Sequence, residues 1–132
     1  MKKSQHILLR VAGSISLLFA IFHMLFFKIF NWAETLACLD KSNWAIFQTL
    51  NLGGIMMVVM IAYFSLFKAN DLISNRLSLP LLVFFSLFYL IRIVAEFLFF
   101  GFSGVESIVI ILLCLIPMIS FMIVLRMKNK EE

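Results

Sequence analysis

Charged residues are scarce in this chain. They make up 14% of its 132 residues, whereas hydrophobic residues make up 64% and the mean hydropathy is +1.10. A soluble domain carries about 25% charged residues, so this composition excludes a protein whose main solvent is water. No stretch of the sequence matches a catalytic, metal-binding or nucleotide-binding motif.

Cysteine and histidine are also rare, with two of each. Cys38 follows the first apolar run, whereas Cys114 lies about ten residues into the last run, roughly 15 Å deep at helical rise. A disulfide between them would be strained. His6 precedes the first run and cannot share a metal with His23, so we predict no metal site; the sequence identifies no cofactor.

Apolar runs dominate what remains. They cover residues 11–30, 44–67, 79–100 and 105–125, and each is long enough to cross a hydrocarbon core of about 30 Å. About 45 residues lie outside these runs, too few for a separate soluble domain. We therefore predict one transmembrane domain over 1–132, an all-α four-helix bundle with antiparallel neighbours. The predicted helices are 7–30, 43–67, 78–101 and 104–126.

Positive charge is distributed unevenly along the chain. Only Lys28 and Lys41 lie near the connection between the first and second spans, and the connection between the third and fourth spans has no basic residue. The other eight basic residues outside the runs flank the two ends and the middle connection: Lys2, Lys3, Arg10, Lys68, Arg76, Arg126, Lys128 and Lys130. Basic residues favour the cytoplasmic side, so both termini are predicted to be cytoplasmic. No basic and aromatic face extends beyond the membrane, so we expect lipids and not nucleic acid as partners.

The short connections carry helix-capping residues. Asn31, with Glu34 three residues later, predicts a short interfacial helix over 32–39. Residues 69–76 are predicted to form a polar loop. The other predicted caps are Ser42 or Asn43 for the second span, Ser78 for the third, and Ser103, in a capping box with Glu106, for the fourth.

Three ionisable residues interrupt the apolar runs: His23, Arg92 and Glu96. Each costs about 2.5 to 3.5 kcal/mol at a helix centre and normally faces the bundle interior. Counted from the outer ends of their runs, these residues, together with Gln48 and Asn51, lie roughly 6 to 12 Å deep. The sequence thus predicts one polar layer in the outer half of the membrane.

Helical spacing predicts that the polar residues face one another. Gln48 and Asn51 share a face of the second helix, and Tyr89 lies on the same face of the third helix as the two charged residues there. The candidate ligand-binding residues are therefore His23, Gln48, Asn51, Tyr89, Arg92 and Glu96.

Three functions fit this layer. The first is a membrane-embedded binding or transport protein that holds a small anionic or carbonyl-bearing ligand at Arg92. The second is an enzyme acting on a lipid-soluble substrate, with His23 or Glu96 as general acid or base. The third is a structural or accessory subunit in which the cluster only joins the helices. A homodimer or a larger membrane partner is compatible with each.

Two segments carry a family resemblance. Residues 43–52, NWAIFQTLNL, and 90–100, LIRIVAEFLFF, together with His23, resemble a family of small, functionally uncharacterised bacterial four-helix integral membrane proteins. The resemblance covers most of the chain. It implies a bacterial cytoplasmic membrane and assigns no chemistry.

Overall fold

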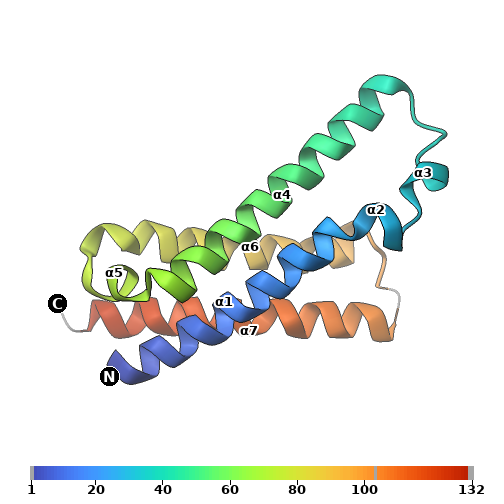
Figure 1. Cartoon of the computed structure of the whole chain (residues 1–132). Coiled ribbons are helices and arrows are strands. Elements are labelled where there is room, and N and C mark those ends of the chain that lie inside the picture. Colours follow the sequence, from blue (N-terminus) through green and yellow to red (C-terminus); the bar gives the residue numbers. More distant parts are fainter. Residues whose placement is uncertain (1, 103, 131–132) are drawn as a thin grey trace.

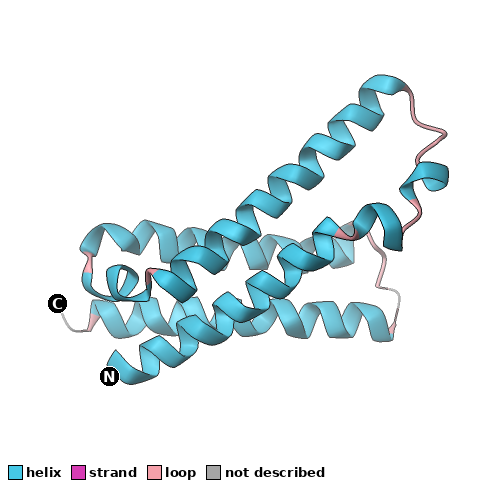
Figure 2. Ribbon diagram, viewed as in Figure 1, coloured by secondary structure: helices cyan, strands magenta, loops and turns pink. Residues whose placement is uncertain are grey.

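Four long helices form a bundle, as predicted. The structure is a computed structural model that describes residues 2–102 and 104–130. Its long helices are α1 (Lys2–Met24), α4 (Lys41–Phe67), α6 (Leu79–Leu98) and α7 (Val105–Asn129) (Figures 1 and 2). All four are long and apolar enough to cross a membrane, which indicates an integral membrane protein.

The bundle has two distinct ends (Figure 1). Both termini and the short helix α5 (Ala69–Ser74) lie at one end, here called the terminal end. The short helices α2 (Phe26–Ile29) and α3 (Trp32–Thr35) lie at the other, the loop end. Helix α1 packs against both α4 and α7, and α6 packs against α7. Towards the loop end, α4 leans away from α6 and α7.

The core fills the terminal half and the middle of the bundle. It is built from side chains that are at most 7% exposed, including Leu9, Ile61, Phe85 and Phe121. At the crossing of α1 and α4, a Cβ on Gly13 would lie 2.7 Å from Leu66 Cγ. The glycine therefore permits this close approach of the helices without displacing Leu66.

The first span ends earlier than predicted. Helix α1 stops at Met24, and α2 begins at Phe26 after a turn at Leu25, so the prediction of one helix to residue 30 is wrong. Aromatic packing accounts for the change of direction. The Phe26 ring lies 4.9 Å from the Phe22 ring and 5.7 Å from the Trp32 ring, both edge to face.

Two predicted caps are replaced by other interactions. Asp40, not Ser42 or Asn43, caps α4, because its Oδ1 accepts from the amides of both residues, at 2.9 and 3.0 Å. The Asn43 amide, followed by the Asn43 side chain, lowers the pKa of this carboxyl. Asn31 precedes α3, but its side chain donates to Glu34 Oε2 at 2.6 Å instead of accepting an amide.

The connection at the terminal end is helical, so the predicted polar loop is wrong. Residues 69–76 form α5 and begin the 3₁₀ turn η1 (Arg76–Ser78), because Ala69, Leu72 and Ile73 make a buried apolar stripe at helical spacing. Ser78 precedes α6 without capping it. The predicted box of Ser103 with Glu106 lies outside the described residues, since Ser103 is not among them.

Lys128 of α7 forms hydrogen bonds to the connection made by α5 and η1. It is only 4% exposed. Its ammonium donates to the carbonyl oxygen of Leu72 at 2.9 Å, to Ser78 Oγ at 2.6 Å, and to the carbonyl oxygen of Asn75. A buried cation thus satisfies acceptors where α5 and η1 end.

Candidate functional site

His23 lies in the last turn of α1 and is half-buried. Its Nδ1 is 2.8 Å from the carbonyl oxygen of Phe19. A carbonyl can only accept, so Nδ1 carries the proton and donates it. In the neutral ring, Nε2 is then a hydrogen-bond acceptor. The ring also stacks on Phe26, with centroids 4.4 Å apart and planes 27° apart, which fixes its orientation.

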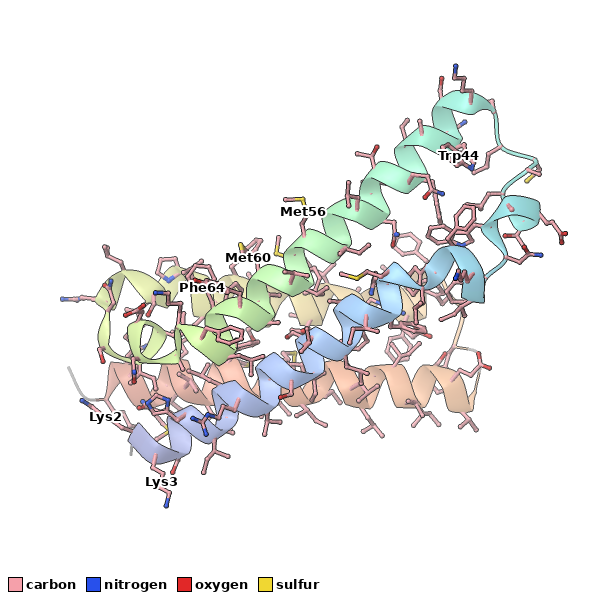
Figure 3. All side chains as sticks on the ribbon, viewed as in Figure 1. Lys2, Lys3, Trp44, Met56, Met60 and Phe64 are labelled. Atoms are coloured by element: carbon pink, nitrogen blue, oxygen red, sulfur yellow. The ribbon has the colours of Figure 1, made fainter. Side chains whose placement is uncertain are left out.

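A cavity of about 220 Å³ opens beside this imidazole. It lies between the end of α1, the short helices and the loop half of α4, and its lining residues are His23, Phe26, Trp32, Phe47, Leu50, Asn51 and Gly54. We call it the His23 cavity. The loop half of α4, residues 41–57, supplies no buried residue, whereas Val58 to Ser65 supply four. The cavity therefore remains open beside the half of α4 that packs least. Figure 3 shows Trp44 near the loop end of α4 and Met56 pointing away from the other helices.

Arg92 and Glu96 form an ion pair on α6. Arg92 Nη1 lies 2.7 Å from Glu96 Oε2, and the side chains are 29% and 2% exposed. The guanidinium carbon also lies 4.7 Å from the centroid of the Phe100 ring. Ser107 of α7 donates to the other carboxylate oxygen at 2.6 Å. Both oxygens of this buried carboxylate therefore accept a hydrogen bond.

A second, smaller cavity brings His23 and Arg92 together. It measures about 40 Å³ and is also lined by Tyr89, Phe19, Val58, Phe88 and Cys114. A water molecule needs at least about 10 to 15 Å³, so this space fits a few waters and no larger ligand. His23 lines both cavities and can link the ion pair to the larger space.

Tyr89 has a structural partner. It is 1% exposed, and its hydroxyl lies 2.6 Å from Ser16 Oγ. The Ser16 hydroxyl already donates a hydrogen bond to the carbonyl oxygen of Ala12 at 2.8 Å. Tyr89 is therefore the donor in its hydrogen bond to Ser16. This bond joins α6 to α1 across the bundle.

The two carboxamides of α4, Gln48 and Asn51, do not join the ion pair. Asn51 lines the His23 cavity. Gln48 is half-buried, and its Nε2 is buried without a hydrogen-bond partner. Within residues 2–102 and 104–130, no hydrogen bond joins either carboxamide to Arg92 or Glu96. The predicted polar layer thus consists of a cavity group on α1 and α4 and an ion-pair group on α6 and α7.

Several site residues escaped the sequence analysis. Ser107 lies near the start of the fourth apolar run, as Glu96 lies near the end of the third, so equal depth could have revealed it. The aromatic wall of Phe26, Trp32 and Phe47 left no comparable signal, because it depends on the turn after α1. In the part of the chain that the structure describes, no three His, Cys, Asp or Glu residues gather into a metal-ligating group.

Comparisons with known proteins identified no similar protein. A scan against protein-family models and searches of curated proteins and of solved structures found no match. The resemblance from sequence therefore extends to a small four-span membrane protein and to no identified family.

Proposed function

We propose that the chain is a membrane-embedded binding or transport protein that holds a small ligand in the His23 cavity. The observation that carries this proposal is the position of His23 and Asn51 on one open cavity. Neither Nε2 of His23 nor the carboxamide of Asn51 bonds to another described residue. Hydrogen-bonding groups without partners are costly inside a membrane, so a ligand that bonds to them is stabilised there.

The proposed ligand lies in the His23 cavity, whereas it was expected at Arg92 from the sequence. The ion pair with Glu96 offsets the charge of the guanidinium, and the cavity that Arg92 lines fits only water. Arg92 would then act on the ligand through water and through His23. A neutral, carbonyl-bearing ligand suits this arrangement better than an anion does.

The enzymatic alternative has less support. A general base needs an unoccupied site that reaches the substrate, but both oxygens of Glu96 already accept hydrogen bonds. His23 has no described hydrogen-bond partner at Nε2 and is the candidate that an enzyme mechanism would use. Under the structural alternative, the same residues would affect stability without retaining a ligand.

The orientation is also part of this proposal. We place the terminal end on the cytoplasmic side of a bacterial membrane, because the sequence positions of eight basic residues correspond to this end and those of only two to the loop end. The His23 cavity would then lie in the outer half of the bilayer. Reactivity of Cys38, which is exposed at the loop end, towards an impermeant thiol reagent applied from outside would test this orientation.

Native mass spectrometry of the purified protein tests the binding function. We expect the wild type to retain a lipid-soluble molecule that His23→Leu loses and that Arg92→Gln retains less well. His6→Leu and Arg10→Gln change the same residue types at the terminal end of α1 and should retain it. A ligand-free spectrum for the wild type, or equal retention by all variants, would contradict the proposal.

A further inference from the structure

We infer that the ligand of the His23 cavity is a neutral molecule with a planar ring that bears a hydroxyl or carbonyl group, and that its apolar remainder stays in the membrane. This inference rests on the proposed function, because it names the chemical class that the same cavity binds.

The walls of the cavity favour a ring. Phe26, Trp32 and Phe47 come from three separate helices, and their rings already pack edge to face. The centroids are 5.7 Å apart for Phe26 and Trp32 and 4.8 Å apart for Trp32 and Phe47. Aromatic rings gain energy beyond area burial in such arrangements, at separations of about 4.5 to 7 Å. A flat ring would extend this packing, whereas an acyl chain would gain only buried area.

The polar groups on the walls favour oxygen substituents. Nε2 of His23 can accept a hydrogen bond, because Nδ1 carries the proton and donates to the carbonyl oxygen of Phe19. Asn51 offers both a donor and an acceptor. A ring hydroxyl can therefore donate to the imidazole, and a ring carbonyl can accept from the carboxamide. Glu96 offsets the charge of Arg92 at 2.7 Å, and none of the described lining residues is an Arg, Lys, Asp or Glu, so the site does not favour a charged group.

The size of the cavity separates the ring from the rest of the ligand. Pockets that enclose a drug-sized ligand usually measure about 300 to 1,000 Å³, and this cavity measures about 220 Å³. It therefore accommodates a ring-sized head group. Leu50, which also lines it, is 70% exposed, so the apolar remainder can lie along the exposed face of α4.

Two adjacent glycines supply a matched pair of variants. A Cβ on Gly54 would lie 3.8 Å from Cδ2 of His23, whereas a Cβ on Gly53 would meet nothing within 4 Å. Gly54→Leu should therefore fill the His23 cavity and leave its polar groups in place. Gly53→Leu adds the same side chain next to it, outside the cavity.

The test uses the fluorescence of Trp32 in lipid nanodiscs. Trp44→Phe removes the other of the two tryptophans, and a decyl-substituted benzoquinone serves as a quenching probe. We expect saturable quenching in the Trp44→Phe protein and in its Gly53→Leu variant, and binding at least about tenfold weaker in the Gly54→Leu variant. Asn51→Leu, which keeps the volume and removes the carboxamide, should also weaken binding. Decylphenol should displace the probe, and decanol should not.

Three results would overturn the inference: no saturable quenching, equal quenching in both leucine variants, or displacement by decanol as effective as that by decylphenol. The last result would leave the proposed binding function intact, because the cavity would then bind apolar alcohols without regard to a ring. Failure of the function itself is read separately, from a wild-type mass spectrum without a retained ligand.

Discussion

The two halves of α4 have opposite surroundings. From Val58 to Phe67 the helix packs into the core and supplies four buried residues, whereas residues 41–57 supply none. Figure 1 shows the same contrast, since α4 leaves the bundle towards the loop end. Side-chain packing therefore concentrates stability at the terminal end, and the half of α4 that packs least borders the candidate site.

The largest stability effect is expected at the terminal end. Lys128→Met leaves buried acceptors at Leu72, Asn75 and Ser78 without their cationic donor. We expect the free energy of unfolding to fall by about 3 kcal/mol, measured by denaturation in mixed detergent micelles. Lys130→Met, at an exposed position two residues later, should change it little. Equal effects of the two variants would contradict the role of Lys128.

Glu96→Gln tests the ion pair of α6, which lies towards the loop end. The change removes the charge opposite Arg92, whose side chain is 29% exposed, and retains an acceptor for Ser107. Because one partner of a buried ion pair is lost, we expect a loss of about 2 kcal/mol, less than for a fully buried pair. Glu106→Gln, at an exposed position on α7, is the control. A stable Glu96→Gln protein would show that the pair does not hold α6 in place.

Two glycine variants compare the surroundings of the two halves of α4: Gly13 of α1 faces the terminal half, and Gly53 lies in the loop half. Gly13→Ala forces its new Cβ against Leu66 and Ser65, at 2.7 and 2.9 Å, and should destabilise the protein by about 1 to 2 kcal/mol. Gly53→Ala meets nothing and should be neutral or slightly stabilising, because alanine favours a helix more than glycine does. If both substitutions cost the same, α4 packs equally along its length and the contrast is wrong.

The smallest effect is expected in the middle of the bundle. Tyr89→Phe removes the hydroxyl that donates to Ser16 at 2.6 Å, and interhelical hydrogen bonds in membranes contribute about 0.6 kcal/mol on average. A double-mutant cycle with Ser16→Ala isolates this bond. A coupling energy near zero would show that the two hydroxyls do not interact.

Sequence patterns predicted the long helices well and the site only in part. Apolar length alone specifies a span, so the four helices followed from composition. The pairing of Arg92 with Glu96 is an interaction along one helix, for which spacing suffices. Gln48 and Asn51 lie three residues apart on α4, but their distance from the ion pair depends on the tilt of this helix. That tilt follows from tertiary contacts such as Gly13 against Leu66, which no local pattern encodes.

The loop half of α4 stands apart from the rest of the bundle. Electron–electron double resonance between spin labels in nanodiscs tests this separation directly, after Cys38 and Cys114 have been replaced by serine and alanine. One pair of labels joins Ile46 to Val109 near the loop end, and the other joins Tyr63 to Met122 near the terminal end; all four side chains are exposed. We expect a clearly longer distance for the first pair. Equal distances would mean that α4 and α7 run parallel throughout and that the loop half of α4 does not lean away.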